Sequence, residues 1–405
     1  MVGLMSNRPQ SAKAFRLGRL AGITFSVLVA AAAHAGEPYT PDRADQVVAR
    51  LPDFEGQGVE ALRVRYRQQP ADRETTLSLA ARYLEHALKS GDARGFGAAE
   101  ATLTKLLAMR PNDAALHWQL ATALRGQHQF GRALQSLDTA LSLQPDNAQM
   151  WLDRASLLAL VGDYQRAEQS CRPVVLNMPA LVGSTCMAMA KAGGRSPQSN
   201  YQKLLHDFDQ YRQHASADVQ AWVLTVLADL AERAGQPERA VNHLRSAVSV
   251  HPEDRFAVLA LATALLRQDR YSEMQLLIGS PASEQSTDIS LQIRQLAASG
   301  RTFDHHRLNE SLASWYQRSQ MRGPLADRTA VEYLYWIKGD VQQAAVVAER
   351  NFAKQKAAED VWLAAATAHA AGDQQRLERV RQWMVSVDYE DARIDDLSNQ
   401  AGGAQ

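Results

Sequence analysis

The sequence has little of what builds metal centres, disulfide frameworks or nucleic-acid surfaces. Its 405 residues include two cysteines, which excludes a small disulfide-bonded fold and any zinc or iron–sulfur site with several cysteine ligands. The 44 Lys and Arg residues are matched by 44 Asp and Glu residues, so the basic excess of a nucleic-acid-binding protein is absent. Hydrophobic residues make up 46% of the chain, which is typical of a globular protein. We therefore expect no nucleic-acid partner.

The first 35 residues have the three parts of a secretory signal. Four basic residues and no acidic ones come before a short apolar run at 20–33, and Ala33-His34-Ala35 follows. A basic start, an apolar stretch and a small-x-small site predict a signal peptide over residues 1–35, cleaved after Ala35. An uncleaved anchor is the alternative, but the run is shorter than the ~20 residues of a membrane-spanning helix. The sequence predicts a periplasmic or secreted bacterial protein with no stable membrane span after cleavage.

A period of 34 residues is the strongest pattern in the chain. Pro111, Pro145 and Pro179 are spaced by 34 residues, and Ala133 and Ala167 by the same interval. Two helices of about a dozen residues and their turns fill such a unit, and proline ends the second helix because it lacks an N–H. One helical hairpin cannot bury its apolar face alone, so neighbouring units stack. The period therefore predicts an all-α array of stacked helix pairs.

This pattern resembles the tetratricopeptide repeat family. The best-matching stretch, 148–179, has these residues on the family pattern: Trp151, Ala155, Gly162, Asp163, Tyr164, Ala167 and Pro179. The resemblance implies a right-handed α-solenoid of antiparallel helix pairs. The whole chain also looks like uncharacterised secreted bacterial tetratricopeptide proteins, a likeness that implies no particular activity.

Composition and periodicity divide the chain further. We expect leading helices over 36–73, an N-terminal repeat array over 74–278 and a polar linker or hinge over 279–287. Helix pairs of the same kind follow over 288–388, and a polar, flexible tail over 389–405. These units leave no room for a separate catalytic domain, and no H-E-x-x-H, Walker A, G-x-S-x-G or G-x-G-x-x-G motif occurs. The sequence predicts no enzyme activity, no cofactor and no metal.

The resemblance also implies which residues line the concave wall. In the family, wall residues come from fixed positions of the first helix of each pair. Asp229 and Glu232 occupy two of these positions, and Arg125 is basic, whereas family members that clamp peptide C-termini have several basic residues there. The groove residues we predict are Trp118, Thr122, Arg125, Leu152, Trp222, Phe256 and Leu259. The aromatic members could anchor an apolar peptide; alternatively they pack against neighbouring repeats.

The two cysteines flank one predicted turn. Cys171 lies 8 residues before Pro179 and Cys186 lies 7 after it. Consecutive helices in such an array are antiparallel neighbours, so these positions fall at similar heights, within the about 4.4–6.8 Å between Cα atoms that a disulfide requires. Export to an oxidising compartment favours the bond. We predict a disulfide, the alternative being two buried thiols.

Two non-catalytic functions fit these features. The first is a periplasmic scaffold or adaptor that binds a protein or peptide in the concave groove. The second is an assembly chaperone for an exported client, such as an apocytochrome or an envelope export complex. The partner itself is not identified by the sequence.

Overall fold

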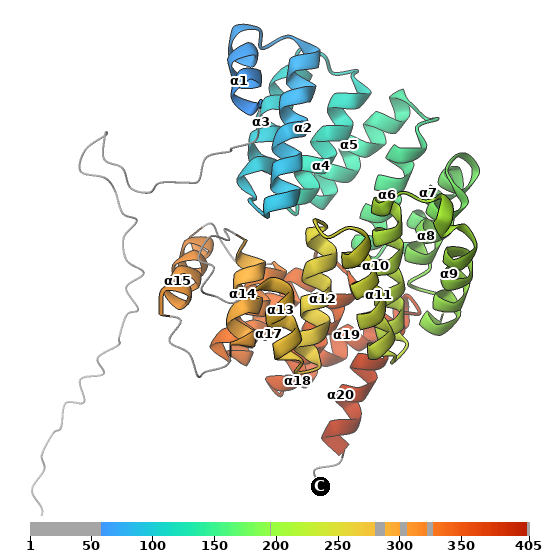
Figure 1. Cartoon of the computed structure of the whole chain (residues 1–405), viewed down its shortest axis with the longest axis vertical. Coiled ribbons are helices and arrows are strands. Elements are labelled where there is room, and N and C mark those ends of the chain that lie inside the picture. The colour runs from blue at the N-terminus through green and yellow to red at the C-terminus, as the bar shows by residue number, and fades with distance from the viewer. Residues whose placement is uncertain (1–57, 195, 280–287, 300–305, 322–326, 403–405) are drawn as a thin grey trace, which may run out of the picture. The chain divides into compact units, whose positions relative to one another are not determined.

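The chain folds into helices that pack in successive antiparallel pairs (Figure 1). The structure is a computed structural model that describes residues 58–194, 196–279, 288–299, 306–321 and 327–402. The predicted signal peptide and most of the predicted linker lie outside the described residues. Among the residues described there is no β-strand, only an isolated antiparallel bridge between Gly193 and Tyr389. The all-α prediction is confirmed.

The helices follow the 34-residue period closely. The N-terminal helices are α1 (Val59–Gln68), α2 (Arg73–Ser90), α3 (Arg94–Leu107), α4 (Ala114–Gly126), α5 (Phe130–Leu143), α6 (Ala148–Leu160), α7 (Tyr164–Asn177), α8 (Ala180–Ala190), α9 (Pro197–Tyr211), α10 (Ala217–Arg233), α11 (Pro237–Val250), α12 (Arg255–Arg267) and α13 (Tyr271–Ile278). The remaining ones are α14 (Ile289–Ala298), α15 (His306–Gln320), α16 (Arg328–Glu332) with the π-helix Tyr333–Lys338, α17 (Val341–Phe352), α18 (Ala358–Ala370), α19 (Gln374–Ser386) and α20 (Ala392–Gly402).

Side-chain caps and glycine turns set the ends of these helices. The carboxylate of Asp113 accepts hydrogen bonds from the first backbone N–H groups of α4, and Asp254 does the same for α12. Such caps pair donors that a helix leaves unsatisfied at its start. Gly162, between α6 and α7, has φ of +83°, a left-handed conformation that costs little only for glycine. The chain therefore reverses sharply there, and the two helices of the pair lie antiparallel.

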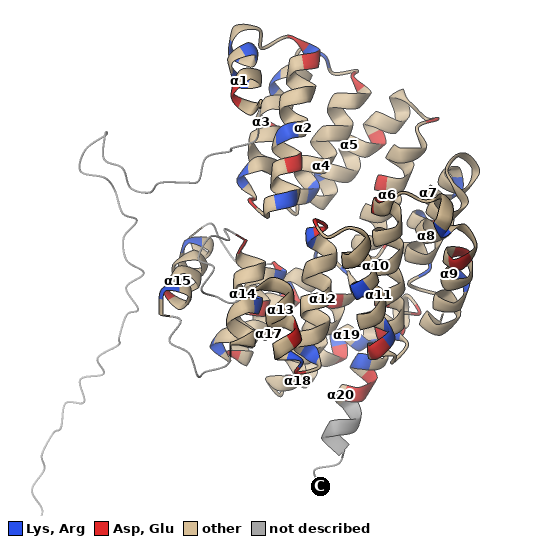
Figure 2. Ribbon diagram, in the orientation of Figure 1, with Lys and Arg blue, Asp and Glu red and all other residues tan. Residues whose placement is uncertain are grey.

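Small residues let the paired helices approach closely. Ala155 on α6 and Ala167 on α7 are both buried in one cluster with Val174 and Val182. Larger clusters join the pairs at α2–α5 and at α8–α13. Lys and Arg alternate with Asp and Glu along the described helices (Figure 2). Stability is thus distributed over contacts between neighbouring pairs, as in a repeat protein.

The chain beyond α19 differs from the expected flexible tail. Tyr389, Asp391 and Ile394 are buried, at 4%, 0% and 1% exposure. They precede or begin α20, which contacts α10 and α18. The polar character of this segment comes from the residues between them, since Asp388 and Glu390 are exposed. Polarity alone therefore gave no sign of the buried side chains.

Candidate functional site

The predicted wall residues all lie on the first helices of their pairs, but they are not equally accessible. Trp118 on α4 is half-buried, contacts the α2–α5 cluster, and donates a 2.6 Å hydrogen bond from its indole N–H to Asp153 on α6. Thr122, one turn on, donates a hydrogen bond to the Trp118 carbonyl oxygen, and Arg125 is half-buried. Trp118 therefore packs between two repeats.

Leu152 on α6 and Trp222 on α10 are brought together by one cluster. Both are half-buried against the core around Cys171 and Cys186, and Trp222 also contacts the α8–α13 cluster. Trp222 thereby bridges the pairs on either side of α8. Its packing matches the alternative in which the aromatic residues fill the space between neighbouring repeats.

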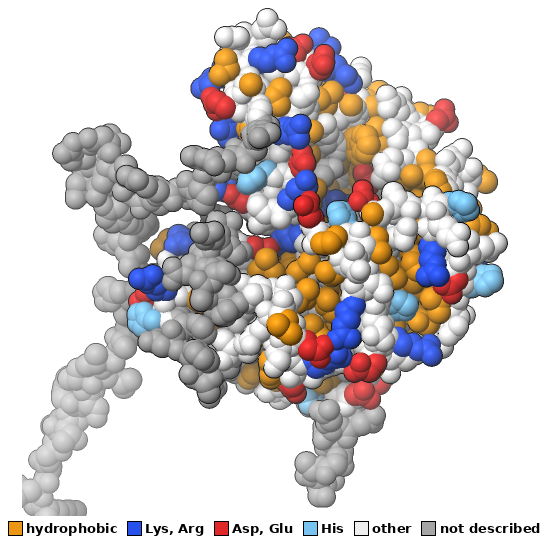
Figure 3. Space-filling view, viewed as in Figure 1, with side chains coloured by type: hydrophobic (Ala, Val, Ile, Leu, Met, Phe, Trp, Pro, Cys, Tyr) orange, Lys and Arg blue, Asp and Glu red, His pale blue; other side chains and the backbone are white. Residues whose placement is uncertain are grey.

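Phe256 is different from the two tryptophans. It is the second residue of α12 and is 57% exposed. The Arg255 guanidinium lies 5.8 Å from its ring centroid, and Leu259, one turn further on, is half-buried. Hydrophobic side chains gather over α10 and α12 on the face that Figure 3 shows. Phe256 is the most accessible of the predicted groove residues.

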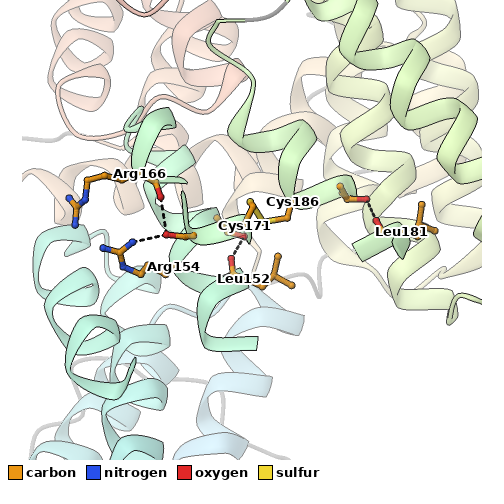
Figure 4. Close-up of a disulfide and its surroundings, with 9 residues drawn as sticks. Leu152, Arg154, Arg166, Cys171, Leu181 and Cys186 are labelled. Atoms are coloured by element: carbon orange, nitrogen blue, oxygen red, sulfur yellow. Dashed lines mark hydrogen bonds between the residues drawn. A yellow bond between two sulfur atoms is a disulfide. The ribbon is translucent and has the colours of Figure 1, made fainter. Parts of the chain in front are cut away.

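The predicted disulfide is confirmed. Cys171 on α7 and Cys186 on α8 are joined, with Cα atoms 5.7 Å apart and both side chains fully buried (Figure 4). Beside it, Arg154 donates a 2.6 Å hydrogen bond to the Ser170 hydroxyl, which itself donates to the carbonyl oxygen of Arg166. The bond connects the second helix of one pair to the first helix of the next.

A feature that the sequence did not reveal is the segment Val387–Arg393, which we call the C-terminal strap. It lies against the turn between α8 and α9, where the Gly194 N–H donates a 2.9 Å hydrogen bond to the carbonyl oxygen of Asp388. Gly193 leaves no room for a side chain, because an added Cβ would lie 2.5 Å from the Val387 oxygen. The strap thus contacts the backbone of a repeat far earlier in the chain.

Arg233, the last residue of α10, holds the middle of the strap. It is 2% exposed, and its guanidinium donates to the carbonyl oxygens of Glu390 and Ala192 at 2.8–3.0 Å. The Tyr389 ring lies 4.0 Å beneath the guanidinium carbon and also contacts Tyr164 and Trp383. The Tyr389 hydroxyl is buried without a hydrogen-bond partner among the described residues.

A buried ion network continues from the end of the strap. Arg393 forms a two-pronged pair with Asp391 at 2.6 and 2.8 Å and donates to Glu232 at 3.1 Å. Arg267 donates to both Glu232 and Glu359. The network therefore joins α10, α12, α18 and α20. Burial raises the pKa of the nearby Asp229 carboxyl, against the opposing effect of Arg233 and Arg393.

The turns of two earlier pairs contact the chain just before α18. The His128 ring lies 3.2 Å from the Gln355 side-chain oxygen, and the Lys356 N–H donates to the carbonyl oxygen of Leu160. The Lys356 side chain lies against Gly162 and the ring of Trp383, where burial lowers its pKa to about 8. Turns of four successive pairs, at His128, Gly162, Gly193 and Gly235, thus meet residues of the C-terminal region.

Two negative findings limit the chemistry of these surfaces. In the part of the chain that the structure describes, no group of three or more His, Cys, Asp or Glu residues is placed to hold a metal ion. The helices described also lack one that combines the length and hydropathy needed to cross a membrane. The charged side chains near the strap are instead paired with one another.

Comparison with known proteins identifies the repeats. Residues 119–174 and 221–264 match models of the tetratricopeptide repeat. No curated protein matches the chain by sequence. Among solved structures, human IFIT1 in a dimer with PPP-AAAA is similar over 81% of this chain and 77% of its own, with 14% identity and a TM-score of 0.44. A tetratricopeptide repeat protein of Parabacteroides merdae covers 64% and 98%, with 18% identity and a TM-score of 0.35.

PilF of Pseudomonas aeruginosa is a third similar structure, covering 69% of this chain and 99% of its own, with 14% identity and a TM-score of 0.30. The two matched segments include α5 and α6 and most of α10–α12. Outside them, the described helices continue as antiparallel pairs. The chain is therefore a tetratricopeptide repeat protein.

Proposed function

We propose that the protein is a non-catalytic scaffold that binds a protein or peptide through the first helices of its repeats. The observation that carries this proposal is Phe256, an aromatic residue that is 57% exposed at a wall position of a matched repeat. Exposed aromatic residues become hot spots when a partner desolvates them. Leu259 extends the same apolar surface by one helical turn.

The partner that fits this surface is a segment with at least one large apolar side chain. Of the predicted groove residues, Trp118 and Trp222 are already packed between repeats, so they shape the wall more than they contact a partner. Their half-buried edges still contribute apolar area. Phe256 and Leu259 supply the anchor.

Affinity capture with a matched pair of variants tests this proposal. Phe256→Ala should reduce capture of the native partner by about 30-fold or more, since losing a buried anchor costs about 2 kcal/mol. Leu276→Ala is the control, because Leu276 is 87% exposed on α13 and lies outside the predicted groove. Equal capture by wild type and Phe256→Ala would remove this surface from the proposal.

The same capture separates a scaffold from an assembly chaperone. A scaffold retains a fixed partner in constant stoichiometry through extended washing. A chaperone for an exported client releases its clients within the wash and captures several of them. We propose the scaffold, since a side chain presented on a fixed helix needs no rearrangement to bind.

We also propose that the protein acts in the periplasm. The pattern of residues 1–35 supports export, and a disulfide such as Cys171–Cys186 is maintained in an oxidising compartment. Cell fractionation and mass determination test this. The expected result is a periplasmic protein beginning at Gly36; a cytoplasmic protein that keeps residues 1–35 would contradict it.

A further inference from the structure

We propose that the turn Ala192–Gly194 and the end of α10 form a recess that recognises an extended peptide, and that the chain's own C-terminal strap is its built-in, releasable ligand. The proposal does not depend on the function proposed for the first helices of the repeats. It concerns a different surface, made by turns between helices and occupied in this structure by residues of the same chain.

The backbone of the strap is recognised as an added β-strand would be. The Gly194 N–H donates to the Asp388 carbonyl oxygen, and Gly193 and Tyr389 form an antiparallel bridge. Arg233 donates to the next carbonyl oxygen, that of Glu390. Main-chain bonds of this kind give affinity for an extended segment whatever its side chains are.

Alternate side chains of the strap provide the specificity. Tyr389 and Asp391 point inward and are buried, whereas Asp388 and Glu390 are exposed. Successive side chains of an extended segment point to opposite sides, so this pattern is what a peptide lying in a recess requires. The ring of Tyr389 fits between the Arg233 guanidinium and the rings of Tyr164 and Trp383.

Charge complementarity fixes the other end. Arg393 reaches Glu232 on α10, and its partner Asp391 orients the guanidinium with two hydrogen bonds. The ligand class is therefore an extended segment with an aromatic residue, an acidic residue two positions later and an arginine two positions after that. The pattern in the strap is Tyr389, Asp391 and Arg393.

Two features indicate that the strap leaves the recess without unfolding the repeats. The Tyr389 hydroxyl is buried without a partner among the described residues, and such a group opposes burial. In addition, the walls of the recess belong to helix pairs whose own clusters lie among α6–α13. The pairs keep those clusters when the strap departs.

Hydrogen exchange on the unmodified full-length protein is the first test. The amides of Gly194 and Tyr389 should exchange at least tenfold faster than the buried amides of Leu116 and Leu157, because they open with the strap alone. If these amides exchanged only at the rate of global unfolding, the strap would be a fixed part of the fold, and the proposal would be overturned.

A peptide-binding experiment is the second test. A fluorescent peptide spanning Val387–Leu397 is added to full-length chains in which the internal ligand is weakened by Tyr389→Ala and Arg393→Ala. We expect it to bind this double variant at least tenfold more tightly than wild type, whose recess is filled. The matched control chain carries Asp388→Ala and Glu390→Ala, which change only exposed side chains, and should behave as wild type.

The peptide supplies its own control. A peptide with Tyr389→Ala should bind the double variant at least tenfold more weakly than the natural peptide. Equal binding of the two peptides, or equal binding of the natural peptide to all three chains, would overturn the recess. If the double variant lost its helical circular dichroism, the exchange rates of the wild-type chain would decide the question.

Discussion

The guanidinium of Arg233 lies 4.0 Å above the ring of Tyr389, a residue that the chain reaches only after five further helix pairs. A cation over an aromatic face contributes about 2 kcal/mol when both are removed from water. Arg233 also donates to two backbone oxygens in the same place. This contact ties α10 to the C-terminal strap, so the repeats near the middle of the array are stabilised by more than their immediate neighbours.

Gly193→Ala should destabilise the protein by about 1–3 kcal/mol, since a Cβ there would meet the Val387 oxygen at 2.5 Å and the Tyr164 ring at 2.6 Å. Gly131→Ala is the control, because it adds a Cβ to a helical glycine with nothing within 4 Å. That change should be neutral or stabilising. Denaturant unfolding of both variants measures the difference, and equal midpoints would show that the strap does not press against this turn.

Much of the fold followed from the sequence because it rests on local patterns. Pro145, Gly162 and Ala167 recur at fixed intervals with the features that end, turn and pair helices, so the helix pairs could be placed to within a few residues. The cysteines could be paired for the same reason: their distance depends on one turn. Among the groove residues, Phe256 could not be distinguished from Trp118 and Trp222, since exposure depends on packing between repeats.

The strap could not be predicted, because its contacts have no period. Arg233 and Gly193 meet residues that follow them by more than 150 positions, and nothing local marks either as a partner. Glu232 was assigned to the concave wall by its repeat position, yet it pairs with Arg267 and Arg393. A signal was present in the alternation of buried and exposed residues at Asp388–Asp391, but four residues are too few for a reliable pattern.

Tyr389→Phe should stabilise the protein by about 1 kcal/mol, because it removes a buried hydroxyl that has no partner among the described residues and keeps the ring. Tyr389→Ala should instead cost about 3–5 kcal/mol if the strap stays in place, as the ring leaves a cavity. Thermal and denaturant unfolding compare the two variants. Destabilisation by Tyr389→Phe would mean that the hydroxyl has a role that the structure does not account for.

Reduction of Cys171–Cys186 should lower the free energy of unfolding by about 3 kcal/mol, the loop-entropy value for a closed loop of about 15 residues. Unfolding is measured with and without a thiol reductant. The double variant Cys171→Ala and Cys186→Ala is the control, since its midpoint should not respond to reductant. An unchanged wild-type midpoint after complete reduction would show that packing alone holds α7 against α8.

The Tyr201–His243 pair predicts a pH dependence. The Tyr201 hydroxyl lies 2.9 Å from the His243 Nε2, and burial lowers the pKa of His243, helped by Arg239 and opposed by Asp209. A histidine whose pKa is lowered in the folded state contributes stability above its ordinary pKa of about 6.5, and that contribution is lost as the pH falls through the folded value.

Between pH 7 and pH 5, wild type should therefore lose stability more steeply than His243→Gln, which keeps a hydrogen-bond acceptor but does not titrate. Urea unfolding at several pH values measures the two slopes. Parallel slopes would show that His243 titrates alike in the folded and unfolded chains.

Site-specific photocrosslinking in living cells tests most directly whether the repeats bind a partner through their first helices. A photoreactive amino acid is placed at Phe256, on the exposed wall of α12, and separately at Leu276, which is more exposed but lies on the second helix of that pair. The account predicts a discrete crosslinked protein from position 256 and none of that size from position 276. The same adduct from both positions, or an adduct from 276 alone, would contradict it.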